Sequence, residues 1–125
     1  MPNAPTKRPR ILVVDDEKVM RELLTLHLKD AGYEVLAAED PVAAGPLVLK
    51  EKPDLLIVDV HMPYMTGYEF VAALKSDPET RDIPVIFLST DDDVADQARK
   101  LGAAAFLSKP VTVDKLLKAV GLLAK

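Results

Sequence analysis

The sequence predicts an α/β fold in which a five-stranded parallel sheet carries five helices on its two faces. Short apolar runs of strand length alternate along the chain with longer segments of helical periodicity. Regular alternation of this kind is typical of consecutive βαβ units, which pair their strands in parallel. The expected strands cover residues 10–15, 33–38, 54–59, 84–89 and 104–108, and the expected helices cover residues 17–31, 41–51, 67–76, 92–102 and 112–124.

Residues with strong positional preferences support several helix boundaries. Gly32 is suited to end the first helix, while Asp40 and Thr112 are suited to cap the second and the last. The acidic run 91–93 is expected to cap the fourth helix in the same way. Pro46 falls inside the second helix and cannot donate a backbone hydrogen bond, so we expect that helix to be irregular or displaced.

Length and composition indicate one ordinary globular domain. The chain has 125 residues, of which 49% are hydrophobic and 29% are charged, and it contains no cysteine that could form a disulfide or a thiolate metal site. A net charge of −4 gives no general attraction for nucleic acid or anionic membranes, so neither is an expected partner. Residues 1–9 carry three prolines and are expected to form a flexible tail. Without a signal-like start or a long apolar run, the expected location is the cytoplasm.

Polar side chains stand where four of the predicted strands end. Asp59 ends the apolar run 54–59, Asp15 and Asp16 follow the first strand, Ser89 ends the fourth, and Lys109 follows the fifth. The carboxyl ends of parallel strands meet at one edge of the sheet, which is where open α/β folds bind their ligands. Three carboxylates, an ammonium and a hydroxyl at that edge suit a divalent cation together with a phosphoryl group.

The ordered set of these signatures resembles the response-regulator receiver domain of two-component signalling. The resemblance extends over residues 9–124 and implies a flavodoxin-like, doubly wound (βα)5 domain over residues 10–125. The length is similar to that of single-domain, chemotaxis-type regulators. The matching residues are Asp15 and Asp16, then Asp59, the loop from Met62 and Pro63 to Gly67, then Ser89, and finally Lys109 with Pro110.

The resemblance implies a role for each residue of the site. Asp59 would accept a phosphoryl group from phosphohistidine on a sensor histidine kinase or a phosphotransfer protein. Mg²⁺, with Mn²⁺ as a substitute, would be held by Asp15, Asp16, Asp59 and the backbone carbonyl of His61. Lys109 would place its positive charge beside Asp59 and the phosphoryl oxygens, and in this family the peptide bond to the following proline is typically cis.

The resemblance also implies a conformational switch. The Ser89 hydroxyl would bind a phosphoryl oxygen, and Phe106 stands at the position of the family's aromatic switch residue. A downstream protein partner would then contact the fourth helix, the fifth strand and the fifth helix. Thr90 replaces the usual alanine or glycine beside the pocket, and His61 occupies a position that often tunes the acyl-phosphate lifetime in this family.

Two other functions remain open from the residues. The first is a receiver-like adapter that is never phosphorylated, which the Thr90 side chain would favour. The second is a phosphohydrolase with an aspartyl-phosphate intermediate, although that class normally has a second aspartate where this chain has His61. The expected chemistry is limited to self-phosphorylation and self-dephosphorylation of a signalling domain, so no enzyme activity toward other substrates is expected.

Overall fold

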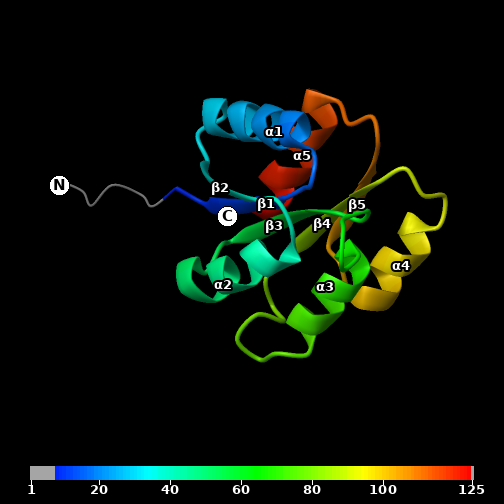
Figure 1. Ribbon diagram of the computed structural model, residues 1–125. Coiled ribbons are helices and arrows are strands. Elements are labelled where there is room, and N and C mark those ends of the chain that lie inside the picture. The colour runs from blue at the N-terminus through cyan, green and yellow to red at the C-terminus, as the bar shows by residue number, and fades with distance from the viewer. Residues whose placement is uncertain (1–7, 125) are drawn as a thin grey trace.

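The computed structural model describes residues 8–124 and contains one sheet of five parallel strands in the order β2-β1-β3-β4-β5 (Figure 1). All four strand pairs are parallel, so the predicted sheet is confirmed. The strands are β1 Arg10–Val14, β2 Glu34–Ala38, β3 Leu55–Asp59, β4 Val85–Ser89 and β5 Ala105–Ser108.

Helices cover both faces of the sheet, as expected for a doubly wound fold. Helices α1 and α5 pack on one face, and α2, α3 and α4 pack on the other (Figure 1). The predicted tail falls mostly on residues 1–7, which lie outside the described residues, as does residue 125. The helices are α1 Lys18–Asp30, α2 Pro41–Glu51, α3 Gly67–Lys75, α4 Val94–Leu101 and α5 Val113–Leu123.

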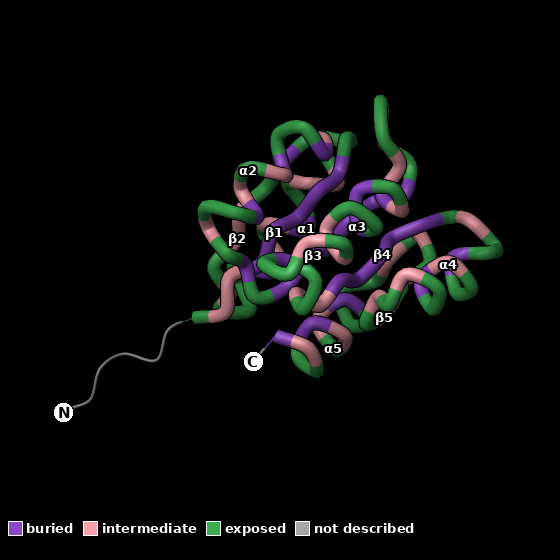
Figure 2. Tube along the Cα trace, turned by 90° about the horizontal axis from the view of Figure 1, so that it is seen from below, coloured by how far each residue is buried: buried purple, intermediate pink, exposed green. Residues whose placement is uncertain are grey.

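The three central strands form the core, which explains their nearly continuous apolar runs. Every residue of β3 and β4 is buried, and so are four of the five residues of β1 (Figure 2). Alternate residues contact opposite helix layers: Leu12 packs toward α2 and α3, whereas Ile11 and Val13 pack toward α1 and α5. A polar residue on these strands therefore costs the least folding free energy at the end of the strand.

Most of the predicted helix boundaries are confirmed by their capping contacts. The Asp40 side chain accepts a hydrogen bond from the Ala43 backbone N–H, and Thr112 accepts one at the start of α5. Gly32 follows α1 with a φ of 99°, a left-handed conformation that favours glycine. The expected cap of α4 was wrong, because Asp93 occupies the N-cap position without a side-chain capping bond.

Helix α2 is neither interrupted nor displaced, contrary to the expectation from Pro46. It spans residues 41–51, the same range as predicted, with Pro46 in its interior. Pro46 is exposed, while Ala44 and Val48 are buried against the sheet. Packing of this apolar face outweighs the local cost of one missing hydrogen bond. Over the described part of the chain, no helix has both the length and the apolar character needed to span a membrane.

Gly67 holds the start of α3 against the end of β3. Its backbone N–H donates to the Val60 carbonyl at 2.8 Å, and Thr66 caps the helix. A Cβ atom at Gly67 would collide with the Asp59 carbonyl oxygen. The missing side chain therefore lets the helix begin directly beside the functional end of the strand.

We expect Gly67→Ala to lower the free energy of unfolding by about 2 kcal/mol or more, since the new methyl group meets backbone that cannot move cheaply. Chemical denaturation measures this change. Gly121→Ala is the matched control, because a Cβ atom there meets nothing and should raise the stability by about 0.5–1 kcal/mol. Equal effects of the two substitutions would contradict the steric argument.

Candidate functional site

The carboxyl edge of the sheet brings the predicted polar residues together. Val14 pairs with Val58, so the next residues, Asp15 and Asp59, lie side by side at the ends of β1 and β3. Beyond β3 in the strand order, Ser89 at the end of β4 pairs with Ser108 at the end of β5, and Lys109 follows Ser108 immediately. The Lys109 backbone N–H donates to the Ser89 carbonyl at 2.9 Å, which fixes the fifth strand end against the fourth.

Lys109 is the cation of this edge and contacts three carboxylates. Its Nζ donates to Asp59 Oδ1 at 3.1 Å and lies 3.6 Å from Glu17 and 3.9 Å from Asp15. Burial alone would lower the pKa of the Lys109 ammonium, but the hydrogen bond to Asp59 and the three negative charges raise it. Lys109 therefore stays charged in the folded protein. The Lys109–Pro110 peptide bond is cis, as the family resemblance implied.

Asp59 is almost completely buried, with 2% of its surface exposed. Burial raises its pKa, and the hydrogen bond and charge of Lys109 oppose that rise. An open cleft of about 310 Å³ leads to its carboxylate and is lined by Asp16, Glu17, Asp59, His61, Thr90 and Lys109. The carboxylate is thus held in place and still accessible from the cleft.

Asp15 carries the most perturbed carboxylate that the structure describes. It is fully buried, and burial raises its pKa from 3.8 to about 6, although a hydrogen bond from the Glu17 backbone N–H lowers it. Its second oxygen, Oδ2, is buried without a hydrogen-bond partner. Its nearest cation is Lys109 Nζ at 3.9 Å, and a carboxylate oxygen without a hydrogen bond is a ready ligand for a divalent cation.

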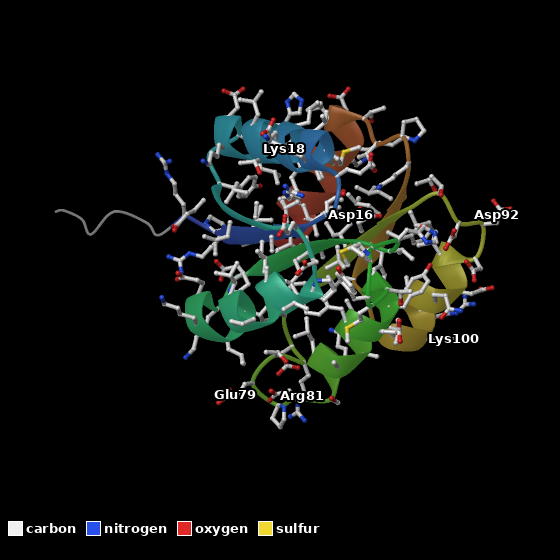
Figure 3. The ribbon with its side chains drawn as sticks, in the orientation of Figure 1. Asp16, Lys18, Glu79, Arg81, Asp92 and Lys100 are labelled. Atoms are coloured by element: carbon white, nitrogen blue, oxygen red, sulfur yellow. The ribbon has the colours of Figure 1, made fainter. Side chains whose placement is uncertain are left out.

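The acidic residues at this edge differ in part from the predicted set. One oxygen each from Asp15, Glu17 and Asp59 lies within 4.8 Å of the others, an arrangement that can hold a metal ion. Asp16, labelled in Figure 3, is exposed like Glu17 and also lines the cleft. Glu17 was not among the residues that the sequence indicated, because its position just before a helix does not by itself show that its carboxylate reaches the strand ends. It is the N-cap of α1 but makes no side-chain capping bond, and its carboxylate faces Lys109.

Ser89 and Phe106 lie on neighbouring strands near the acidic cluster. Ser89 is fully buried, and its Oγ accepts a hydrogen bond from the Asp91 backbone N–H at 2.9 Å. Phe106 pairs with Phe87 across the two strands and leaves 39% of its surface exposed. The Ser89 hydroxyl is therefore bonded to its own loop, and the Phe106 ring lies partly in solvent.

Thr90 and His61 both line the cleft. His61 Nε2 lies 2.7 Å from Asp91 Oδ1, an ion pair when the imidazole is protonated. This contact joins the loop after β3 to the loop after β4. The sequence did not predict it, since Asp91 was expected to cap α4.

The family model of the response regulator receiver domain matches residues 11–121. The chain is a response-regulator receiver domain. It is 38% identical over 113 residues to Protein PilH of Pseudomonas aeruginosa, covering 89% of this chain and 93% of PilH. The structure of the chemotaxis response regulator CheY4 of Vibrio cholerae superposes with a TM-score of 0.87 at 34% identity, covering 94% of this chain and 99% of that one.

Other relatives are about twice as long as this chain. It is 33% identical to the DNA-binding transcriptional regulator RpaA of Synechocystis, covering 94% of this chain but 49% of RpaA. It is 39% identical to the phosphate regulon regulator PhoB of Pseudomonas aeruginosa, covering 88% of this chain and 50% of PhoB. These matches show the receiver fold and family. The activities of the longer proteins are not assigned to this chain, which spans about half of their length.

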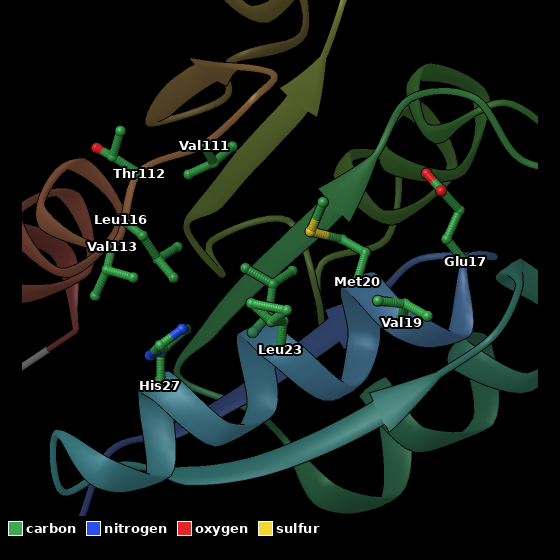
Figure 4. Close-up of a pocket in the computed structure, with 10 residues that line it drawn as sticks. Glu17, Val19, Met20, Leu23, His27, Val111, Thr112, Val113 and Leu116 are labelled. Carbon is green, nitrogen blue, oxygen red and sulfur yellow. The ribbon is translucent and has the colours of Figure 1, made fainter.

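A second cavity in this receiver domain shares Glu17 with the acidic edge and extends from there along α1. It has a volume of about 170 Å³ between α1 and α5 and is lined mainly by apolar side chains, with Met20 and Leu23 facing Val111 and Leu116 (Figure 4). His27 projects toward it from α1. The acidic edge is consequently the candidate site.

We expect Asp15→Asn to raise the free energy of unfolding at pH 7.5, without metal, by about 1–3 kcal/mol. The pKa of Asp15 is higher in the folded than in the unfolded chain, so ionisation costs stability as pH rises from about 4 to about 6. Urea denaturation across that window should show a smaller loss in the variant than in the wild type. Asp16→Asn, at an exposed position, is the control and should change little. A less stable Asp15→Asn protein at pH 7.5 would contradict this account.

Proposed function

We propose that this receiver domain accepts a phosphoryl group on Asp59 from a phosphohistidine donor and changes conformation to signal to a protein partner. The observation that carries the proposal is the buried Asp59 carboxylate, hydrogen-bonded to Lys109 at the base of an open acidic cleft. Receiver domains work with histidine kinases or phosphotransfer proteins, and we propose the same class of donor here.

In the proposed step, an Asp59 carboxylate oxygen attacks phosphorus and forms an acyl phosphate. The nitrogen–phosphorus bond breaks, and its electron pair returns to the imidazole of the donor. Lys109 offers an ammonium to the phosphoryl oxygens without leaving the acidic cluster. The position two residues after Asp59 holds His61, paired with Asp91, and offers no second aspartate for hydrolysing other phosphate esters. We therefore limit the proposed chemistry to the protein's own phosphorylation and dephosphorylation.

The acidic edge fits Mg²⁺, for which Mn²⁺ is a substitute. Asp15 Oδ2 and Asp59 are proposed as ligands, together with Asp16 and the His61 backbone carbonyl that the family implies. Glu17 is a further candidate, because its carboxylate lies within reach of both buried aspartates. When bound, the cation supplies positive charge that offsets the repulsion between these carboxylates and a phosphoryl dianion.

Ser89 and Phe106 are proposed to convert the new charge into a surface change. The phosphoryl group adds about −1.5 to −2 charge and strong acceptor oxygens, toward which the Ser89 hydroxyl would turn. The Phe106 ring, which is 39% exposed, would then turn inward into the space that Ser89 leaves. The rearranged surface of α4, β5 and α5 is the proposed contact for a downstream protein, by a population shift between two conformations.

The deciding experiment is intact mass after incubation with acetyl phosphate and Mg²⁺. We expect the gain of one phosphoryl group, dependent on Mg²⁺ and absent in Asp59→Asn. Ser89→Ala is the matched control, since it keeps the acceptor and should still gain the group. A folded protein that gains nothing, from acetyl phosphate or from a phosphohistidine donor, would instead support a receiver-like adapter.

Mg²⁺ alone should raise the melting temperature of the wild-type protein, because a bound cation relieves the unpaired Asp15 oxygen and the crowded carboxylates. Differential scanning calorimetry with and without Mg²⁺ measures the shift. The shift should be much smaller in Asp15→Asn and intermediate in Glu17→Gln if Glu17 is a ligand. An identical shift in Asp15→Asn would exclude Asp15 from the metal site.

Thr90→Ala should raise the rate of phosphorylation or of dephosphorylation about 2- to 10-fold, equivalent to about 0.4–1.4 kcal/mol. The reason is that the Thr90 side chain lines the cleft and occupies space that alanine would leave open to the phosphodonor or to water. Time courses of intact mass, with the donor present and after its removal, give both rates. The melting temperature of the variant serves as the control for folding. Rates identical to those of the wild type would remove Thr90 as a gate.

A further inference from the structure

Tyr68 of α3 is partly buried and packs against the core, with its hydroxyl enclosed by the protein. Its ring packs edge-on against Phe87, with ring centroids 5.1 Å apart and an angle of 80° between the planes. Its hydroxyl is buried and, among the residues that the structure describes, has no hydrogen-bond partner. Buried tyrosine hydroxyls usually have one, so this orphaned group calls for an explanation.

The hydroxyl lies against the segment that joins β4 to α4. Burial raises the pKa of Tyr68, the charges of Asp93 and Asp91 raise it further, and the Ser89 side chain is close enough to lower it. Helices α3 and α4 lie side by side on this face of the sheet (Figure 1). The unpaired oxygen therefore stands next to residues 89–93, the segment that must respond if Ser89 moves.

Ser89 makes a hydrogen bond that it would lose on turning toward a phosphoryl group. In the present arrangement its Oγ accepts the Asp91 backbone N–H at 2.9 Å. A Ser89 hydroxyl that turns toward a phosphoryl group leaves the half-buried Asp91 N–H without its present acceptor. The Asp91 side chain is tied to His61 and does not fill that role. The Asp91 N–H is then free to pair with a neighbouring acceptor.

We propose that Tyr68 is a positioning residue whose hydroxyl accepts the Asp91 backbone N–H once Ser89 turns toward the phosphoryl group. The inference rests on the proposed function, which assigns that turn to Ser89. The hydroxyl is unpaired in the present arrangement and paired in the switched one. Tyr68 thereby destabilises the first relative to the second and favours the response to phosphorylation.

The first test uses unphosphorylated protein and removes the acceptor of the Asp91 N–H by mutation. In the wild-type background, Tyr68→Phe deletes an orphaned hydroxyl, so its melting temperature should stay the same or rise. In the Ser89→Ala background the Tyr68 hydroxyl would already accept the Asp91 N–H. Tyr68→Phe would then remove that hydrogen bond and should lower the melting temperature. Tyr64→Phe is the control in both backgrounds, because Tyr64 is 91% exposed. Equal effects of Tyr68→Phe in the two backgrounds would overturn the proposal.

The second test measures the response itself with beryllofluoride and Mg²⁺, a mimic of the phosphoryl group. We expect Tyr68→Phe to weaken beryllofluoride binding about threefold or more, since the switched state loses a partner that the resting state does not use. Titrations followed by backbone amide NMR give the affinity, and Tyr64→Phe should match the wild type. Unchanged affinity in Tyr68→Phe would overturn the proposed role.

The two tests separate this inference from the proposed function. If wild-type protein binds no beryllofluoride and gains no phosphoryl group, the proposed function fails. The melting temperatures of the four proteins in the Tyr68 and Ser89 cycle still decide whether the hydroxyl takes over the Asp91 N–H. A background-dependent effect would then support the takeover alone.

Discussion

The balance between two buried carboxylates and one ammonium is the interaction on which the rest of this site depends. Asp15 and Asp59 end adjacent strands of the sheet core, where burial raises the pKa of both. Lys109 reaches them from the end of β5 and holds its charge because they are there. One cation does not neutralise the two aspartates and Glu17, so the edge remains short of positive charge. That deficit is the physical reason why we propose a divalent cation at this position.

The same balance explains why the fold places its polar residues at one edge. The central strands are buried on both faces, and a charged side chain in their middle would lose its hydration without compensation. At the carboxyl ends the loops open a cleft, so Asp59 is held by the sheet and reached by solvent. Gly67 adds a second constraint, because the start of α3 passes too close to the Asp59 backbone to accept a side chain.

The segment from Ser89 to Asp93 connects this edge to the rest of the domain. Ser89 bonds to the Asp91 backbone, the Asp91 side chain bonds to His61, and Tyr68 lies beneath with an unpaired hydroxyl. Each contact involves a group that a phosphoryl on Asp59 would disturb or could engage. Phe106 stands on the adjacent strand, partly exposed, beside the face assigned to the partner. A change of charge at Asp59 could thus alter the surface through only a few contacts.

Much of the fold and part of the site could be predicted from the residues. The alternation of strand-like and helical runs predicted every element, because burial on both faces makes strand sequences distinctive. The strand ends predicted the grouping of Asp15, Asp59, Ser89 and Lys109 for the same reason. Pro46 misled the prediction for α2, since its local cost is smaller than the packing of the apolar face it shares.

The sequence by itself determined the sheet, its five helices and the edge where Asp15, Asp59, Ser89 and Lys109 gather, because periodicity and strand order are properties of the chain. The tertiary structure alone decided which side chains touch within that edge. It placed the Glu17 carboxylate beside Lys109, paired Asp91 with His61, and left the Tyr68 hydroxyl without a hydrogen bond. Those outcomes depend on distances between loops far apart in the chain, which no local pattern of residues encodes.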